Sequence, residues 1–247
     1  MSITLNADMG EAFGIHTFGN DTALLDYVDT INVACGMHSG DPSTMARTVT
    51  AALDANVTIG AHPGLPDLTG FGRREMILTA DETRDLIRYQ VGALTAFLHA
   101  AGAPLHHIKP HGALYGMLSR NEELMESACD VAEQYGVPIL GLPHTAHQRV
   151  AERRGVEFVA EFYVDLDYND DGTIIVNRTA THHDLTHIEA KARRALVDGK
   201  TTSIRGTEID VTVESLCIHS DLPNAPDVAA RIRQLLDEHQ GSTTTTV

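Results

Sequence analysis

Residues capable of acid–base or electrostatic chemistry stand at the ends of five apolar, strand-like runs. The runs are ITLNADMGE with Asn6, Asp8 and Glu11, INVACGMHSGDP with His38 and Asp41, VTIGAHPGLPD with His62 and Asp67, HHIKPHGALY with Lys109 and His111, and LCIHSDLP with His219 and Asp221. A parallel α/β domain places its chemistry at the carboxyl ends of its strands. We therefore expect these side chains to meet in one site, as in an enzyme.

The first run has the sharpest pattern. Asn6 and Asp8 are two residues apart, so on a strand they point to the same side, and Gly10 allows a tight turn that presents Glu11. The alternative is that Asp8 or Glu11 only caps the next helix. Asn6 favours the functional interpretation because it interrupts an otherwise apolar strand.

Two histidines follow glycine-containing turns at the next strand ends. His38 in CGMH and His62 in GAH could act as general acids or bases, or as metal ligands. Each alone could equally be a hydrogen-bonded turn histidine, but together with Asp8 they favour function. Asp41 stands before Pro42 and is expected to cap a helix.

Lys109 and His111 are predicted to share one face at the fourth strand end. A cation beside a titratable ring suits the oxygen of an amide carbonyl or a phosphoryl group, where negative charge develops. It suits a metal cage less well, because Lys109 would repel the ion. Arg73 and Arg74 could clamp a carboxylate, although a solvated charged run is an equal alternative.

Composition narrows the classes of partner. The 247 residues include 34 acidic and 18 basic side chains, for a formal charge of -16, which argues against binding to nucleic acid or to an anionic membrane. The N-terminus lacks a signal-peptide pattern, and no apolar run approaches the ~20 residues that cross a bilayer, so a cytoplasmic protein is expected. Cys35 and Cys217 fall in apolar runs and are expected to be buried.

Seven strand-like segments alternate with helix-like stretches. They are expected near residues 3–8, 30–35, 57–61, 106–109, 137–141, 157–162 and 214–219. This alternation predicts an α/β fold with a parallel sheet, in one domain over residues 1–240. Residues 163–186 interrupt it with a turn at 168–173 and a short strand, IIVNR, a hairpin that could act as a lid. The tail 241–247 is expected to be disordered.

The chain contains no convincing nucleotide-binding loop. Residues 198–201, Asp-Gly-Lys-Thr, look like the end of a P-loop, but Arg194 stands where that motif has its first glycine. They also follow a helix rather than a strand, so Gly199 is interpreted as a helix C-cap. The GxSxG and HExxH motifs are absent from the sequence.

Several long motifs resemble the LamB/YcsF family, the proteins that form the A subunit of 5-oxoprolinase. The stretches are NADMGEAFG, NVACGMHSGDP, IGAHPGLPDLTGFGRR, YQVGAL, KPHGALY, YNDDGT and CIHSD, from residue 6 to about residue 221. The resemblance implies a seven-stranded β/α barrel of the glycoside hydrolase/deacetylase type. It also implies hydrolysis of 5-oxoproline (pyroglutamate) or a related lactam to L-glutamate, with ATP and Mg²⁺, in a complex with partner subunits B and C. The chain departs from the family at Leu166, where Arg is expected, and at Ser220, where Gly is expected.

These observations lead to one set of assignments. We assign catalytic roles to Asp8, Glu11, Lys109 and His111, and substrate-binding roles to Asn6, His38, His62, Arg73 and Arg74. Asp8, with Glu11 as its substitute, would activate water, and Lys109 would stabilise negative charge while His111 and His62 donate hydrogen bonds or a proton.

Two other functions fit the same residues. The first is a metal-dependent deacetylase or amidase acting alone, with Asp8, His38, His62 and His111 as candidate ligands of a divalent cation. The second is a non-catalytic subunit that binds a small molecule and only shapes the site of a partner.

Overall fold

A curled sheet of parallel strands forms the centre of the computed structural model, which describes residues 2–176 and 181–244. Its strand order is β3-β2-β1-β10-β5-β4. The strands are β1 (Thr4–Met9), β2 (Thr30–Ala34), β3 (Thr58–His62), β4 (Ile139–Gly141), β5 (Phe158–Tyr163) and β10 (Ser215–His219). All pairings in this sheet are parallel, so the carboxyl ends of the strands lie at one rim.

Residues 106–109 close this sheet into a barrel. Ile108 forms parallel bridges to Ala61 of β3 and to Ile139 of β4. The backbone N–H of Lys109 donates to the carbonyl of Ala61, and the N–H of Leu140 donates to the carbonyl of Ile108. The seven strands predicted from the sequence are therefore present, and the predicted barrel is confirmed.

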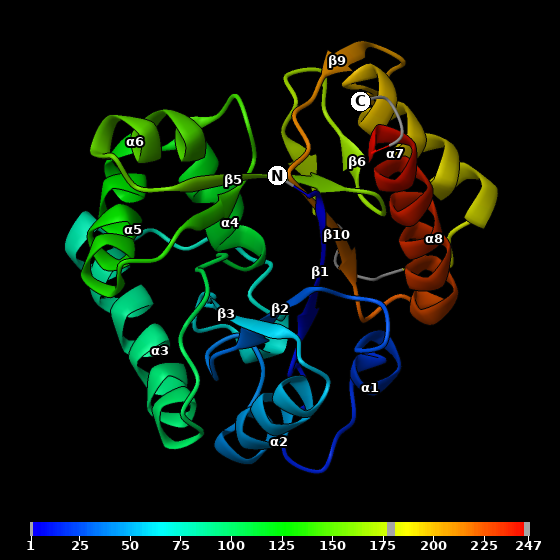
Figure 1. Ribbon diagram of the computed structural model, residues 1–247. Helices are drawn as coiled ribbons and strands as arrows, with labels where there is room; N and C mark the ends of the chain where they lie inside the picture. The colour runs from blue at the N-terminus through cyan, green and yellow to red at the C-terminus, as the bar shows by residue number, and fades with distance from the viewer. Residues whose placement is uncertain (1, 177–180, 245–247) are drawn as a thin grey trace.

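Helices surround the strands and cover the outside of the barrel (Figure 1). The α-helices of the described residues are α1 (Asp21–Leu24), α2 (Pro42–Asp54), α3 (Ala80–Ala100), α4 (Gly112–Arg120), α5 (Glu122–Tyr135), α6 (Ala146–Arg154), α7 (Leu185–Asp198) and α8 (Ala225–Thr244). A short 3₁₀ helix, η1, spans Leu68–Gly70. Asp41 caps α2 as predicted, because its carboxylate accepts hydrogen bonds from the N–H groups of Ser43 and Thr44.

Two antiparallel hairpins extend from the barrel. β6 (Asp167–Tyr168) pairs with β7 (Ile174–Ile175) across the predicted turn, and β8 (Lys200–Thr202) pairs with β9 (Glu208–Asp210). The predicted strand IIVNR is shorter than expected, and its last two residues lie outside the described part. The action of this hairpin as a lid stays a prediction.

The C-terminal end differs from the expectation. Helix α8 continues to Thr244, so residues 241–244 are helical instead of belonging to a disordered tail. Residues 245–247 lie outside the described part of the chain.

The interior of the barrel contains polar as well as apolar residues. Leu5, Ile31 and Leu216 belong to the hydrophobic core, whereas Asn32 and His107 are polar and fully buried within the barrel. Nε2 of His107 is hydrogen-bonded to Oδ1 of Asn32, so this histidine has a structural role inside the barrel. Buried polar groups carry a desolvation cost unless they are paired, and these are paired. Within residues 2–176 and 181–244, every helix is too short or too polar to span a lipid bilayer.

The three cysteines are unpaired and buried, as expected for Cys35 and Cys217. Burial raises the pKa of the Cys35 thiol to about 12. Burial also raises the pKa of the Cys217 thiol well above its ordinary value, so burial disfavours the thiolate form of both residues.

Candidate functional site

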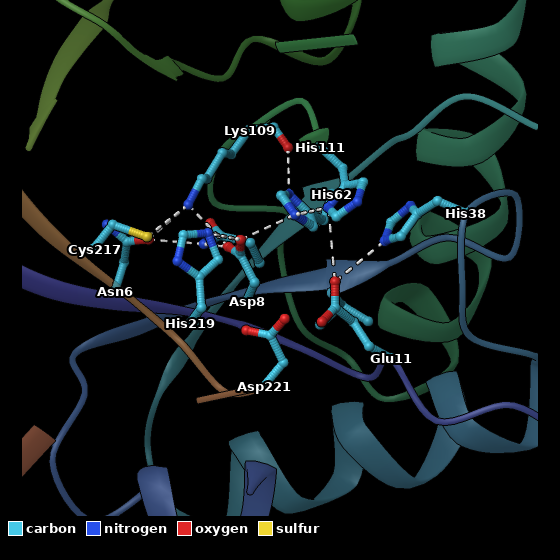
Figure 2. A network of polar contacts seen from close by, with 12 residues as sticks. Asn6, Asp8, Glu11, His38, His62, Lys109, His111, Cys217, His219 and Asp221 are labelled. Carbon is cyan, nitrogen blue, oxygen red and sulfur yellow. Dashed lines mark hydrogen bonds and ion pairs between the residues drawn. The ribbon is translucent and has the colours of Figure 1, made fainter. Parts of the chain in front are cut away.

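A pocket of about 600 Å³, including its part open to solvent, lies at the carboxyl ends of the strands. Five residues predicted for the site line it: Asp8, His62, Arg73, Lys109 and His111. Asp8 comes from β1, His62 from β3, and Lys109 and His111 from the segment that closes the barrel. Figure 2 shows the side chains of these last four residues directed toward one another. Parallel strand direction brings them together, as the sequence predicted.

Lys109 lies at the centre of a buried charge network. Its Nζ is 2.9 Å from Oδ1 of Asp8 and 2.8 Å from Oε1 of Glu161, and it donates to Sγ of Cys217 at 3.0 Å. Only 1% of the side chain is exposed, so Lys109 is not a surface lysine. Burial alone would lower the pKa of Lys109, but Asp8, Cys217 and Glu161 outweigh it and hold this pKa well above its ordinary value.

Asp8 stays ionised because cations surround its carboxylate. Its Oδ1 accepts a hydrogen bond from Lys109 and another, at 2.7 Å, from Nδ2 of Asn32. Its Oδ2 is 3.2 Å from Nε2 of His62 and 3.5 Å from Nε2 of His219. Burial opposes ionisation, yet His62 and Lys109 hold the pKa of Asp8 well below its usual range. The pocket therefore presents a fixed negative charge at this point.

His219, at the end of β10, is the cationic acid of the site. Its Nδ1 is 3.0 Å from Oδ2 of Asp165, which also accepts a hydrogen bond from the His219 backbone. Burial by itself lowers the pKa of His219, but the charges of Asp165 and Asp8 reverse this effect and raise the pKa to about 9. His219 is therefore protonated at neutral pH and lines the pocket beside Asp8.

One ring nitrogen of His62 and one of His111 must carry a hydrogen. Nδ1 of His62 is 2.7 Å from the carbonyl oxygen of Lys109, and Nε2 of His111 is 2.8 Å from the carbonyl oxygen of Phe71. A carbonyl oxygen only accepts, so these two nitrogens carry the hydrogens and donate. Burial, together with His38 and His62, holds the pKa of His111 well below its ordinary value.

Glu11 and His38 form a buried layer behind these two rings. Nε2 of His38 is 3.3 Å from Oε1 of Glu11, and the His38 ring stacks on the His111 ring with centroids 3.7 Å apart. Burial, Asp8 and Asp221 raise the pKa of Glu11 well above its ordinary value, while burial and His62 lower that of His38. One potential ligand atom from each of Glu11, His38, His62 and His111 lies within 4.8 Å of the others, so this cluster could hold a metal ion.

Two glycines leave room for the side chains of His38 and His111. A Cβ atom on Gly64 would lie 2.4 Å from Nδ1 of His38, and one on Gly72 would lie 2.6 Å from Cβ of His38 and 2.9 Å from Cδ2 of His111. Gly72 also has a φ of +62°, a backbone conformation that residues other than glycine rarely adopt. The loop after β3 is thus shaped to fit the histidine cluster.

The two arginines of the predicted pair point to different places. Arg73 lines the pocket, with Nη2 3.2 Å from Oδ2 of Asp221 and its guanidinium group over the Phe71 ring. Arg74 instead pairs with Asp67, and half of its side chain is exposed outside the pocket lining. The assignment of Arg74 to substrate binding is therefore corrected, because Asp67 in its own loop already binds it.

Three other predicted residues lie behind the pocket wall. Asn6, His38 and Glu11 are buried and absent from the pocket lining. Oδ1 of Asn6 accepts from Asn32 at 2.8 Å and from Lys109 at 3.3 Å, so Asn6 supports Lys109. These positions correct the predicted contacts of Asn6 and His38 with substrate, and they leave Glu11 poorly placed as a substitute for Asp8.

Sequence reasoning missed two acidic residues. Glu161 lies within β5, and Asp165 follows that strand by two residues. The signal for Glu161 was available, because a glutamate inside the apolar run FVAEFY must pair with a cation if the strand is buried. No local sequence pattern indicates that this cation is Lys109, because Lys109 lies 52 residues earlier in the chain.

The hairpin segment forms one wall of the pocket. Leu166, Ile174 and Val176 line it, and so does His183, which the sequence left without a role. Leu166 presents an apolar surface where the family motif has a guanidinium group. Ser220 is buried outside the pocket lining, and its carbonyl oxygen accepts hydrogen bonds from the backbone and side chain of Asn20.

Comparison with known proteins gives one consistent result. The model of the LamB/YcsF family matches residues 3–247. A lactam utilization protein from Emericella nidulans is 41% identical over 95% of this chain and 94% of its own length. A 5-oxoprolinase A subunit from Thermococcus sibiricus is 41% identical over 96% of this chain and 95% of its own length.

Solved structures agree with the fold. The crystal structure of a lactam utilization protein from Thermus thermophilus is similar with a TM-score of 0.87 and 38% identity, covering 96% of this chain and 97% of that chain. A β-N-acetylhexosaminidase from Streptomyces coelicolor has a TM-score of 0.51 at 12% identity, covering 95% of this chain and 63% of that chain, which shows only a shared fold.

Removal of the Lys109 charge should destabilise the protein strongly. The substitution Lys109→Met leaves Asp8 and Glu161 buried without their cation, so the free energy of unfolding should fall by about 3–5 kcal/mol. Chemical denaturation measures this loss. The matched control Arg120→Gln breaks an exposed pair with Glu75 and should cost about 0–1 kcal/mol. Equal effects of the two substitutions would contradict the buried network.

The His219–Asp165 pair should stabilise the protein in a defined pH window. The folded pKa of His219, about 9, exceeds the unfolded value of about 6.5, so the pair contributes fully below pH ~6.5 and its contribution is lost as pH rises through ~9. The stability difference between wild type and Asp165→Asn should therefore shrink over this window. An NMR titration in which His219 of the wild type titrates near its ordinary value would refute this prediction.

Proposed function

Because this chain belongs to the LamB/YcsF family, we propose that it is the A subunit of an ATP-dependent 5-oxoprolinase. Such an enzyme hydrolyses 5-oxoproline or a related lactam to L-glutamate. Relatives named as the A subunit of 5-oxoprolinase or as a lactam utilization protein align with nearly the whole chain. The structural observation that carries the proposal is the convergence of Asp8, Lys109 and Arg73 on one pocket.

The residues at the pocket match the needs of lactam opening. An amide nitrogen is a poor leaving group, so negative charge on the carbonyl oxygen must be stabilised and the nitrogen must gain a proton. Lys109 supplies the positive charge, and Asp8 accepts a hydrogen bond from the attacking water. The proton donor in this proposal is His219, because it is protonated. His62 and His111 each donate a ring N–H to a backbone carbonyl oxygen instead.

Arg73 is proposed to bind the carboxylate of the substrate. Its side chain is mostly buried and reaches the pocket beside Asp221. A guanidinium group binds a carboxylate through two parallel hydrogen bonds. Leu166 and Ile174 give the opposite part of the pocket an apolar surface, which suits the methylene groups of a lactam ring.

ATP, with Mg²⁺, is proposed to bind in the assembled complex with partner subunits B and C. Residues 198–201 do not form a phosphate-binding loop, because Gly199 ends α7 and Lys200 pairs with Glu208 in the neighbouring strand. ATP would supply activation of the carbonyl oxygen by phosphorylation. The requirement for partners follows from the names of the relatives, which describe each of them as one subunit of 5-oxoprolinase.

A metal-dependent amidase that acts alone is the second candidate. One observation favours it: the cluster of Glu11, His38, His62 and His111 beside the pocket. This candidate predicts amide hydrolysis without ATP and without partners, so the same assay separates the two functions.

Reconstitution tests the proposed function. The purified chain, mixed with candidate subunits B and C, 5-oxoproline and Mg²⁺–ATP, should form L-glutamate and ADP, and omission of the chain should abolish glutamate formation. Asp8→Asn should lower turnover by about 10²–10⁴-fold, the typical contribution of a general base. Equal glutamate formation by B and C alone would refute the proposal, and full activity of Asp8→Asn would refute the role of Asp8.

The adjacent arginines provide a matched test of substrate binding. Loss of a charged hydrogen-bond partner costs about 1.5–3 kcal/mol, so Arg73→Gln should raise KM for the lactam about 10- to 100-fold. Arg74→Gln removes the same charge one residue away and should leave KM unchanged, because Arg74 pairs with Asp67 outside the pocket. Steady-state kinetics measures both, and a similar KM change in the two variants would contradict the assignment.

A further inference from the structure

Two ring nitrogens face each other beside the pocket. Nε2 of His62 lies 3.0 Å from Nδ1 of His111, and the opposite nitrogen of each ring donates to a carbonyl oxygen, that of Lys109 or of Phe71. Two nitrogens at this distance need a positive charge between them, either a shared proton or a metal ion. Oδ2 of Asp8, 3.2 Å from the same Nε2, adds a further electron-pair donor.

The carboxylate of Glu11 completes the arrangement. Its Oε1 is 3.7 Å from Nδ1 of His111 (Figure 2). For a tetrahedral ion with bonds of about 2.0–2.1 Å, neighbouring ligand atoms lie about 3.3 Å apart, between the two distances observed here. Imidazole and carboxylate ligands suit first-row transition metals. We propose that Glu11, His62 and His111 bind one divalent transition-metal ion, of which Zn²⁺ is the test case.

His38 has a different role in this proposal. Its ring is parallel to that of His111, with an interplanar angle of 5°. An ion bound in the plane of one stacked ring lies out of the plane of the other, so both rings do not bind it in this arrangement. Nε2 of His38 instead faces Oε1 of Glu11 at 3.3 Å and positions this carboxylate. Such outer partners orient the ligands and tune metal affinity.

The proposed ion has a coordination position directed toward the pocket. His62 and His111 line the pocket, whereas Glu11 lies behind them. Three protein ligands with an open fourth position are typical of catalytic zinc, and two histidines with one glutamate are a known set of that kind. The open position would accept a water molecule or an amide oxygen, next to the carboxylate of Asp8.

Lys109, which made a metal cage the less suitable interpretation of the sequence, is compatible with a cation in this proposal. Its Nζ lies 2.9 Å from Asp8 and 2.8 Å from Glu161, so two carboxylates face one ammonium group. The ammonium charge is more than balanced before a metal ion enters. The protonated His219 also lies beside Asp8, and it is paired with the carboxylate of Asp165. Two cations therefore face three carboxylates, and the local field favours a further cation beside Asp8.

Direct metal binding tests this proposal, which does not rest on lactam turnover. The full-length chain, freed of metal with a chelator, is titrated with Zn²⁺ by calorimetry. We expect one Zn²⁺ per chain in the wild type, and no stoichiometric binding in His111→Gln or Glu11→Gln. His38→Gln should keep the stoichiometry and lose about 10- to 100-fold in affinity. The control His106→Gln, at the opposite end of the closing strand, should bind like the wild type.

Two results would overturn the proposal. One is a wild-type chain that binds no Zn²⁺, which would mean that a proton lies between the two rings. The other is Zn²⁺ binding of unchanged affinity in both His111→Gln and Glu11→Gln. Circular dichroism checks the fold of each variant, and Glu11→Gln, which keeps the side-chain shape, decides the outcome if His111→Gln does not fold. None of these measurements needs substrate, ATP or partners, so their outcome is separate from that of the reconstitution.

Discussion

The ammonium group of Lys109, buried inside the barrel, constrains the whole carboxyl-terminal rim. A buried charge is tolerated only when opposite charges and hydrogen bonds surround it. Asp8 from β1, Glu161 from β5 and Cys217 from β10 meet this requirement, with contacts of 2.8–3.0 Å. Strands that are far apart in the sequence must therefore pair in a register that brings these three side chains to the same ammonium group. The charge network and the barrel thus depend on each other.

The backbone of the same residue also determines the state of the histidines. The carbonyl oxygen of Lys109 binds Nδ1 of His62, which turns Nε2 of that ring toward Asp8 and His111. The side chain of Lys109 thus keeps Asp8 ionised while its carbonyl keeps His62 oriented. The environment sets a different protonation state for each group in this site. His219 is held protonated, Asp8 is held charged, and burial holds the pKa of His111 well below its ordinary value.

Much of the fold could be predicted from the sequence because its signals are local. Each strand lies in a mostly apolar run, which is typical of parallel strands covered on both faces. The Asp41 cap depends on neighbours in the sequence, and so does the turn at 168–173. Helices α4 and α6 have nine residues each, which is too few for a clear helical periodicity in the sequence. The family resemblance added the closed barrel, which alternation of strands and helices alone does not distinguish from an open sheet.

The sequence by itself determined which strand ends carry chemistry and that Asp8, His62, Lys109 and His111 belong to one rim. Only the tertiary structure decided which side chains reach the pocket. It placed Arg73 in the pocket lining and Arg74 outside it, and it placed Asn6, Glu11 and His38 behind the pocket wall. It also added Glu161 and Asp165, which pair with Lys109 and His219. The physical reason is that the local sequence pattern indicates where each strand ends. The burial, charge pairing and tautomer of a side chain depend instead on residues that contact it in the fold but are distant in the sequence.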